Sequence, residues 1–139
     1  MSSERLFLDT VYIQAILNRA DQHHARAVAL YPRVKAAREV WVTEAVLLEV
    51  GAALSALDRM AAARFLRSLY LTPNVHVVPI EAILFQRGLD LYEMRPDKTW
   101  SLTDCLSFVV MKDQTLYLAV TADEHFQQAG YHALMREGL

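Results

Sequence analysis

Cysteine, glycine and long apolar runs are scarce in this chain of 139 residues, and each scarcity excludes a class of protein. The single cysteine, Cys105, rules out an internal disulfide and is typical of a reducing cytoplasm. Four glycines are too few and too scattered to build a Gly-rich phosphate loop. No apolar stretch approaches the roughly 20 residues that span a bilayer. We therefore expect a cytoplasmic protein with no membrane partner.

Several catalytic motifs are also missing. There is no Gly-x-Ser-x-Gly segment, which argues against an α/β-hydrolase triad. His23 and His24 have no partner at His-x-x-x-His spacing, so a zinc site is not expected. A phosphatase of the Asp-x-Asp kind needs a second aspartate where Val11 stands. The first residues, Met1 to Arg5, have no secretory layout.

The charge balance gives no broad basic footprint for nucleic acid. The net charge is −2, from 16 acidic residues against 14 lysines and arginines. If four acids held metal, the remaining surface would be slightly basic. Two predicted helices carry basic groups, which we interpret as solvated helix faces: Arg33, Lys35 and Arg38 on one, and Arg59, Arg64 and Arg67 on the other.

The chain reads as one globular α/β domain over residues 1–139, with 54% apolar residues and no Pro/Gly-rich linker. Strands are predicted at Leu6–Asp9, Val40–Thr43, Val75–Pro79, Leu116–Val120 and, more weakly, Tyr131–Leu134. Helices are predicted at Val11–Arg19, Asp21–Arg38 (kinked or divided at Pro32), Thr43–Leu57, Asp58–Leu69, Ile80–Met94 and Ser101–Lys112. This alternation predicts a three-layer α/β/α sandwich around a mainly parallel sheet of four to five strands.

Four acids fall where such a fold would gather them: Asp9, Glu49, Asp104 and Asp123. Asp9 ends one predicted strand, and Asp123 closely follows another. Ligand sites in open parallel sheets form outside the carboxyl ends of the strands. Carboxylates collected there are suited to hard divalent cations. Metal-dependent phosphodiester chemistry is therefore the leading hypothesis.

Each acid also has a structural alternative. Asp9 is equally suited to cap the helix after it. Glu49 lies within the apolar stripe that contains Val46 and Ala53, so we expect it to face the core, where an ionised carboxylate needs a partner or a metal. The alternative is a glutamate at the edge of the stripe that pairs with an arginine. Asp104 is the N3 residue of a capping box whose N-cap is Ser101, and that role alone would explain it.

The segment around Asp123 is a further candidate. Thr121 and Glu124 are spaced as another capping box, which leaves Asp123 without a structural duty. Thr121, like Thr10 beside Asp9, is a possible assisting residue. Asp97 is expected in an exposed loop with a minor assisting role. His125 is interpreted as a surface or packing histidine.

These segments together resemble a PIN domain of the small stand-alone kind that forms the toxin of VapBC-type toxin–antitoxin pairs. The resemblance covers nearly the whole chain. The matching pieces are Phe7-Leu8-Asp9-Thr10, Thr43 to Val50, Ser101 to Phe108, and Thr121 to Phe126 followed by Ala129-Gly130.

The resemblance implies that Asp9, Glu49, Asp104 and Asp123 bind Mg²⁺ or Mn²⁺ and that the protein is an endoribonuclease inhibited by a small antitoxin. Alternatives remain open: a PIN-domain nuclease of RNA processing, or a non-catalytic RNA- or protein-binding domain. We also expect a homodimer, since apolar residues on the helices at 21–38 and 58–69 exceed what a small sheet needs.

Overall fold

The computed structural model describes residues 2–138, and its centre is a five-stranded sheet. The strand order is β3-β2-β1-β4-β5, and all neighbouring strands are parallel. The strands are β1 (Arg5–Leu8), β2 (Glu39–Thr43), β3 (Val75–Val78), β4 (Leu118–Val120) and β5 (His132–Ala133). The predicted parallel sheet is confirmed, including its weakest strand.

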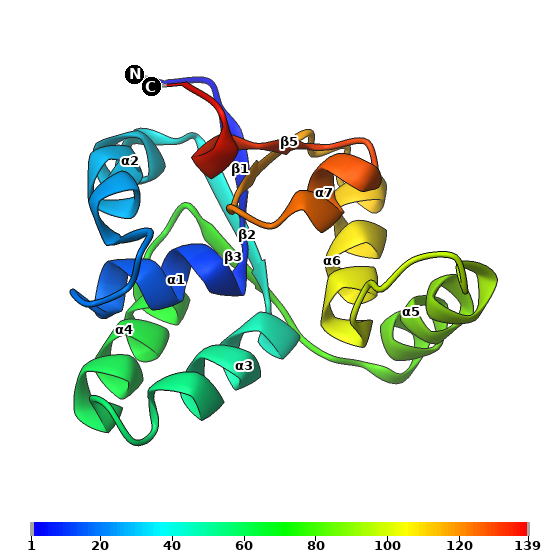
Figure 1. The fold of residues 1–139 in the computed structure, drawn as a ribbon, viewed down its shortest axis with the longest axis horizontal. Helices are drawn as coiled ribbons and strands as arrows, with labels where there is room; N and C mark the ends of the chain where they lie inside the picture. The colour runs from blue at the N-terminus through cyan, green and yellow to red at the C-terminus, as the bar shows by residue number, and fades with distance from the viewer. Residues whose placement is uncertain (1, 139) are drawn as a thin grey trace.

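Helices cover the sheet on both sides, as the α/β/α prediction requires. Figure 1 shows α1 to α4 on one side of the sheet and α5 to α7 on the other. The helices are α1 (Thr10–Leu17), α2 (His24–Ala36), α3 (Glu44–Leu54), α4 (Arg59–Leu71), α5 (Ala82–Met94), α6 (Leu102–Asp113) and α7 (Glu124–Gln128), with a 3₁₀ turn at Leu134–Arg136.

Local capping explains where the helices near the site begin. The Thr43 side chain accepts a hydrogen bond from the Val46 N–H at 3.2 Å, so α3 starts directly after β2. Ser101 and Asp104 form the predicted capping box at the start of α6, each accepting from the other's backbone N–H. The predicted capping box of Ser101 and Asp104 is confirmed. These bonds satisfy backbone donors that a helix start leaves free.

The structure differs from the helix predictions at two places. Of the two outcomes expected at Pro32, a kink or a division, the division is wrong, because α2 continues through Pro32 from His24 to Ala36. The proline leaves the Val28 carbonyl without a helical donor, and both residues are exposed, so water can bind that oxygen. The short α7 was not predicted, because its five residues are too few for a helical pattern to show.

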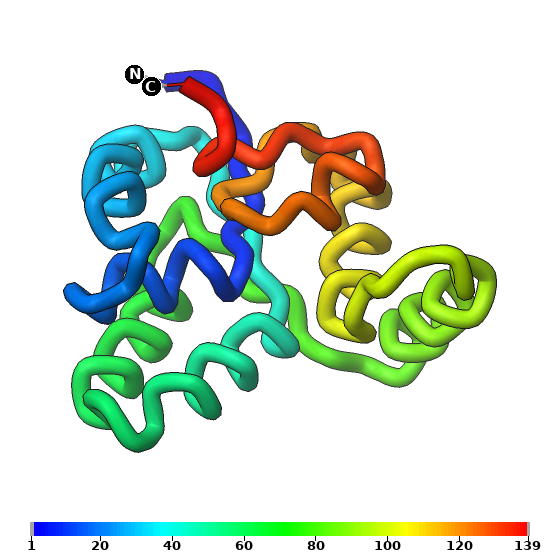
Figure 2. The backbone as a smooth tube through the Cα atoms, viewed as in Figure 1, coloured from blue at the N-terminus to red at the C-terminus, as the bar shows by residue number. Residues whose placement is uncertain are grey.

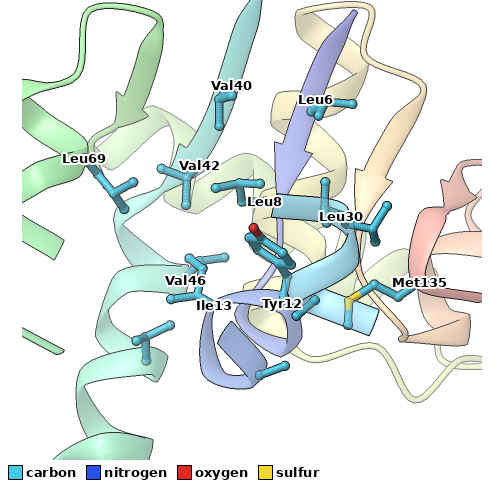
Figure 3. Close-up of a cluster of buried hydrophobic side chains, with 14 of the residues drawn as sticks. Leu6, Leu8, Tyr12, Ile13, Leu30, Val40, Val42, Val46, Leu69 and Met135 are labelled. Carbon is cyan, nitrogen blue, oxygen red and sulfur yellow. The ribbon is translucent and has the colours of Figure 1, made fainter. Parts of the chain in front are cut away.

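The larger core lies between the sheet and α1 to α4. Successive residues of β1 point to opposite faces, so Leu6 and Leu8 enter this core and Phe7 enters the other. Figure 3 shows Leu8 close to Tyr12 and Val42, with Leu6 further along β1. A strand that is apolar on both faces requires cover on both sides.

The topology brings the two ends of the described chain together. Figure 2 shows the segments at both termini leaving the molecule at the same place. The opposite ends of the parallel strands lead into the helix starts, so the residues after β1, β2 and β4 face a common region. Within residues 2–138, no helix has the length and apolar character to span a membrane.

Candidate functional site

Asp9 is the most deeply placed of the four predicted acids. It follows β1 and occupies the N-cap position of α1, yet its side chain makes no cap hydrogen bond. Instead, Asp9 Oδ2 accepts a hydrogen bond from Thr121 Oγ1 at 2.7 Å. Asp9 is only 4% exposed and Thr121 is fully buried. The capping alternative does not explain this carboxylate, which points across to β4.

Asp104 reaches the same region from the first turn of α6. Its Oδ2 accepts from the Ser101 N–H at 3.1 Å and lies 3.0 Å from His125 Nδ1. The Asp104 carboxylate therefore caps α6 and also belongs to the acidic cluster. Ser101 limits the directions that the side chain can take.

Asp123 has a structural duty that the sequence pattern did not reveal. It is the N-cap of α7, and its Oδ1 accepts from the His125 N–H at 2.9 Å. The expected capping box of Thr121 and Glu124 is wrong, because Thr121 Oγ1 instead accepts from the Asp123 N–H at 3.0 Å and donates to Asp9. One hydroxyl therefore joins Asp9 to the start of α7.

His125 was the residue most underestimated from the sequence. Its Nδ1 lies 3.0 Å from Asp104 Oδ2 and 3.3 Å from Asp123 Oδ1, so it is part of the acidic cluster and not a mere surface residue. Ionised carboxylates only accept, which assigns the proton to Nδ1, and Nε2 faces Thr99 Oγ1 at 3.1 Å. Its position just after Asp123 was the only signal available.

The electrostatics of the cluster reflect burial without a cation. Burial raises the pKa of Asp9 from 3.8 to about 7; the Thr121 hydroxyl opposes this shift, and the Asp104 and Asp123 carboxylates add to it. Burial likewise raises the pKa of Asp104, again with a contribution from Asp123. Among the described residues, no lysine or arginine forms an ion pair with these three acids.

Glu49 does not face the core, and that expectation was wrong. The buried face of α3 is formed by Ala45, Val46, Leu47, Val50 and Leu54, which leaves position 49 exposed at the margin of the apolar stripe. Its Oε1 accepts a hydrogen bond from Thr10 Oγ1 at 3.0 Å. Glu49 is thus connected to the cluster through the neighbour of Asp9, without a direct contact to the other three acids.

Asp97 lies in the exposed loop where it was expected. Both of its carboxylate oxygens accept from Arg95, at 3.0 Å each. Because that ion pair occupies the carboxylate, nothing in the geometry connects Asp97 with the acidic cluster. Thr10, the other assisting candidate, is buried and bonded to Glu49.

The donor set has the composition of a cation site. Asp104, Asp123 and His125 each offer a ligand atom within 4.8 Å of one another. Asp9 adds a buried carboxylate that accepts from the Thr121 hydroxyl and from the Thr10 backbone. Oxygen-rich sets of this kind suit Mg²⁺ or Mn²⁺, and His125, with its proton on Nδ1, would hold Asp104 and Asp123 in place. A divalent cation would offset both the burial and the charge repulsion that raise the pKa of Asp9, so the residues fit such an ion.

Comparison with known proteins agrees with this fold. A model of the PIN domain family matches residues 6–130. Solved structures are also similar, among them the following two. VapC20 of Mycobacterium tuberculosis, described as a sarcin–ricin loop cleaving toxin, has a TM-score of 0.81 and 24% identity, covering 91% of this chain and 96% of its own. FitAcB of Neisseria gonorrhoeae has a TM-score of 0.60 and 16% identity, covering 92% and 95%. No curated protein matches by sequence.

Proposed function

This chain belongs to the PIN domain family, and from that premise we propose that it is an endoribonuclease dependent on Mg²⁺ or Mn²⁺. The observation that carries the proposal is the burial of Asp9 beside Asp104 and Asp123, to which no lysine or arginine within residues 2–138 is paired and only His125 lies close. Keeping charged groups in such surroundings is costly unless a ligand compensates. A domain that only bound partners would gain nothing from this arrangement.

In the proposed mechanism, Asp9, Asp104 and Asp123 would hold the cation, and Glu49 would complete the set at its exposed side. When bound, the cation supplies Lewis-acid activation of water and neutralises charge on the scissile phosphate. Thr121 keeps Asp9 in one rotamer through its 2.7 Å hydrogen bond. Ser101 and His125 do the same for Asp104, so that the carboxylates need little rearrangement when an ion arrives.

The decisive experiment is cleavage of single-stranded RNA by the purified protein with Mn²⁺ and with EDTA. We expect cleavage only with the metal, and large losses in Asp9→Asn, Glu49→Gln, Asp104→Asn and Asp123→Asn. Double variants should lose little more than singles, because residues that act as a unit are not additive. Unchanged cleavage in EDTA would reject the mechanism, and full activity of Asp104→Asn would leave that residue as a cap only.

We further propose that the protein is the cytoplasmic toxin of a VapBC-type pair, with a small antitoxin as its partner. The support is the similarity to VapC20, a toxin by its own description. The neighbouring reading frame tests this: a short gene whose product inhibits the nuclease supports the toxin. Cleavage that no co-encoded protein inhibits would favour a nuclease of RNA processing.

A homodimer is the remaining proposal about partners. Some of the apolar residues that suggested it pack internally, since Leu30 and Leu69 are buried. Val28 of α2 and Met60 and Tyr70 of α4 are exposed, at 48%, 65% and 55%. Exposed apolar groups on neighbouring helices are suited to a symmetric interface. Light scattering decides: a monomer mass that persists as the concentration rises rejects the dimer.

A further inference from the structure

A cavity of about 460 Å³ lies outside the acidic cluster, among α5, α6 and α7. These helices lie together on one side of the sheet (Figure 1). The volume is within the range of small-ligand sites. Its wall is largely apolar and includes the rings of Trp100 and Tyr131, while Arg87, Arg95 and Lys112 add three cationic side chains. An apolar cavity with several charged groups at its edge is suited to a flat, polar ligand.

The cavity and the acidic cluster share two segments of chain. Trp100, in its wall, stands between Thr99 and Ser101. Thr99 Oγ1 contacts His125 Nε2, and the Ser101 N–H donates to Asp104. Adjacent Cα atoms are about 3.8 Å apart. One short segment between α5 and α6, which Figure 2 shows as a loop, therefore borders both sites.

The second shared segment is α7. Gln128 lies in the cavity wall, one helical turn after His125 of the acidic cluster. The Gln128 Oε1 accepts from the Trp100 indole N–H at 3.0 Å, which leaves its amide N–H₂ group without a partner among the described residues. Arg95 lies over the Trp100 ring, with Cζ 5.0 Å from the ring centroid. Aromatic, guanidinium and amide groups are thus gathered at one wall.

The two arginines are held in place by acids outside the cavity lining. Arg87 makes two hydrogen bonds to Asp113, and Arg95 makes two to Asp97. These ion pairs largely neutralise the two guanidinium charges. Arg87 and Arg95 therefore offer a ligand rigid planar surfaces and N–H donors more than uncompensated positive charge. Lys112 forms no ion pair within residues 2–138. As a ligand of the cavity, this combination of groups favours a nucleobase with a phosphate nearby over a phosphate alone.

We propose that this cavity binds one unpaired nucleobase of an RNA strand whose scissile phosphate lies at the acidic cluster; the inference rests on the proposed ribonuclease function. Single-stranded RNA is recognised by splayed bases that pack on aromatic rings and arginine planes and bond through their edges. Gln128 and Asp90 supply donors and acceptors for those edges, and Lys112 faces the backbone. An apolar peptide side chain is the competing occupant, but it would leave these polar groups unused.

Binding of fluorescent, unstructured, mixed-sequence single-stranded RNA to the metal-free protein in EDTA tests the proposal. Ala129→Phe places a ring in the cavity and should weaken binding by roughly tenfold. Lys112→Glu should weaken it by about threefold or more and flatten its salt dependence. The matched control is Lys35→Glu: both lysines are exposed in the last turn of a helix, but Lys35 lies on α2, across the sheet. The control should bind RNA as the wild type does.

Three outcomes would overturn the base site. In the first, both cavity variants, Ala129→Phe and Lys112→Glu, bind RNA with wild-type affinity. In the second, Lys35→Glu and Lys112→Glu lose the same amount of RNA affinity. In the third, RNA that carries thiouridine crosslinks to α2 or α4 and not to the cavity wall. Wild-type affinity in both cavity variants would instead favour an apolar peptide side chain as the occupant of the cavity. Lys112 is exposed, so its variant keeps the test valid if Ala129→Phe fails to fold. If the wild type shows no Mn²⁺-dependent cleavage while the cavity variants still bind RNA poorly, the nuclease proposal fails and the base site stands.

Discussion

Leu8 and Asp9 are adjacent in the chain and nearly equally buried, at 2% and 4% exposure, yet burial has opposite consequences for them. Leu8 packs in the core between the sheet and α1 to α4, where removal from water stabilises the fold. Asp9 enters the acidic cluster, where burial disfavours its ionised form and raises its pKa to about 7. The proposed metal site would explain why the protein keeps a group that is unfavourable for stability at this position.

The two regions are also organised differently. The core depends on side-chain volume and on contact with several helices. The cluster depends on directed hydrogen bonds from Thr121, Ser101 and His125, each of which fixes one carboxylate oxygen. Substitutions in the first region should therefore change stability, and substitutions in the second should change metal binding and catalysis.

The largest expected effect is on catalysis. Asp9→Asn should lower Mn²⁺-dependent RNA cleavage by at least about 1,000-fold, because it removes one charge from a group of residues that acts as a unit. Leu8→Val, its neighbour in the core, should retain most of the wild-type rate. Single-turnover cleavage at saturating metal measures both. Comparable losses of cleavage in Asp9→Asn and Leu8→Val would show that the core and the acidic cluster do not differ in this way.

Next in size is the stability of the core. Leu8→Ala should lower the free energy of unfolding by about 2–5 kcal/mol, because it leaves a cavity among fully buried neighbours. Folded Leu8→Ala should still bind Mn²⁺, since its change lies outside the hydrogen-bond network of the cluster. Urea unfolding measures the free energy of unfolding, and calorimetric titration measures the affinity for Mn²⁺. A loss of metal affinity as large as that of Asp9→Asn would show that the regions are coupled.

The pH dependence of the metal-free protein should follow from Asp9. With a pKa raised from 3.8 to about 7 on folding, Asp9 keeps a proton in the native state that the unfolded chain has released between those values. Stability should therefore fall as the pH rises through this window, by roughly 4 kcal/mol in total. Asp9→Asn should remove most of this slope. Urea midpoints in EDTA between pH 4 and 8 test it, and a slope that survives in Asp9→Asn assigns the effect to other groups.

Binding of Mn²⁺ should offset the loss of stability that the ionised Asp9 causes in the metal-free protein. At about 100 times its dissociation constant at pH 8, Mn²⁺ should stabilise the wild type by roughly 2.7 kcal/mol. The same Mn²⁺ concentration should stabilise it less at pH 6, because a proton must first leave Asp9. Asp123→Asn should raise the metal-free melting temperature and reduce the response to Mn²⁺. Thermal melts with EDTA or Mn²⁺ provide the measurement. A variant that melts lower without metal and responds as the wild type does would contradict the clustered-acid interpretation.

The smallest effect concerns one hydroxyl. Thr121→Val removes the donor to Asp9 and the acceptor for the Asp123 N–H, and should cost about 1–2 kcal/mol of stability. Because the hydroxyl lowers the pKa of Asp9, its loss should move the pH transition to higher pH. The same urea series measures this shift. Thr10→Val, which loses only the bond to Glu49, is the control and should leave the transition in place.

The order of elements and the candidate acids could be predicted from the sequence alone. The alternation of apolar runs with helical patterns predicted a parallel sheet between helical layers, because each element must bury its apolar face. Predicted strand ends agree with the structure to within two residues, as for Leu116–Val120 against β4 at Leu118–Val120. The caps at Thr43 and Ser101 were also predictable, since they depend on bonds over three residues.

Only the tertiary structure decided what each acid touches. Glu49 fell within an apolar stripe in the sequence, but the packing of α3 turned Val46, Leu47 and Val50 inward and left Glu49 at the margin. Thr121 reaches Asp9 across 112 positions of the chain, and no local pattern reports such a bond. The same is true of His125 and Asp104, whose contact depends on how α7 packs beside α6. Sequence periodicity determines which face of an element is apolar, whereas the meeting of side chains from distant elements depends on the folded arrangement of the whole sheet.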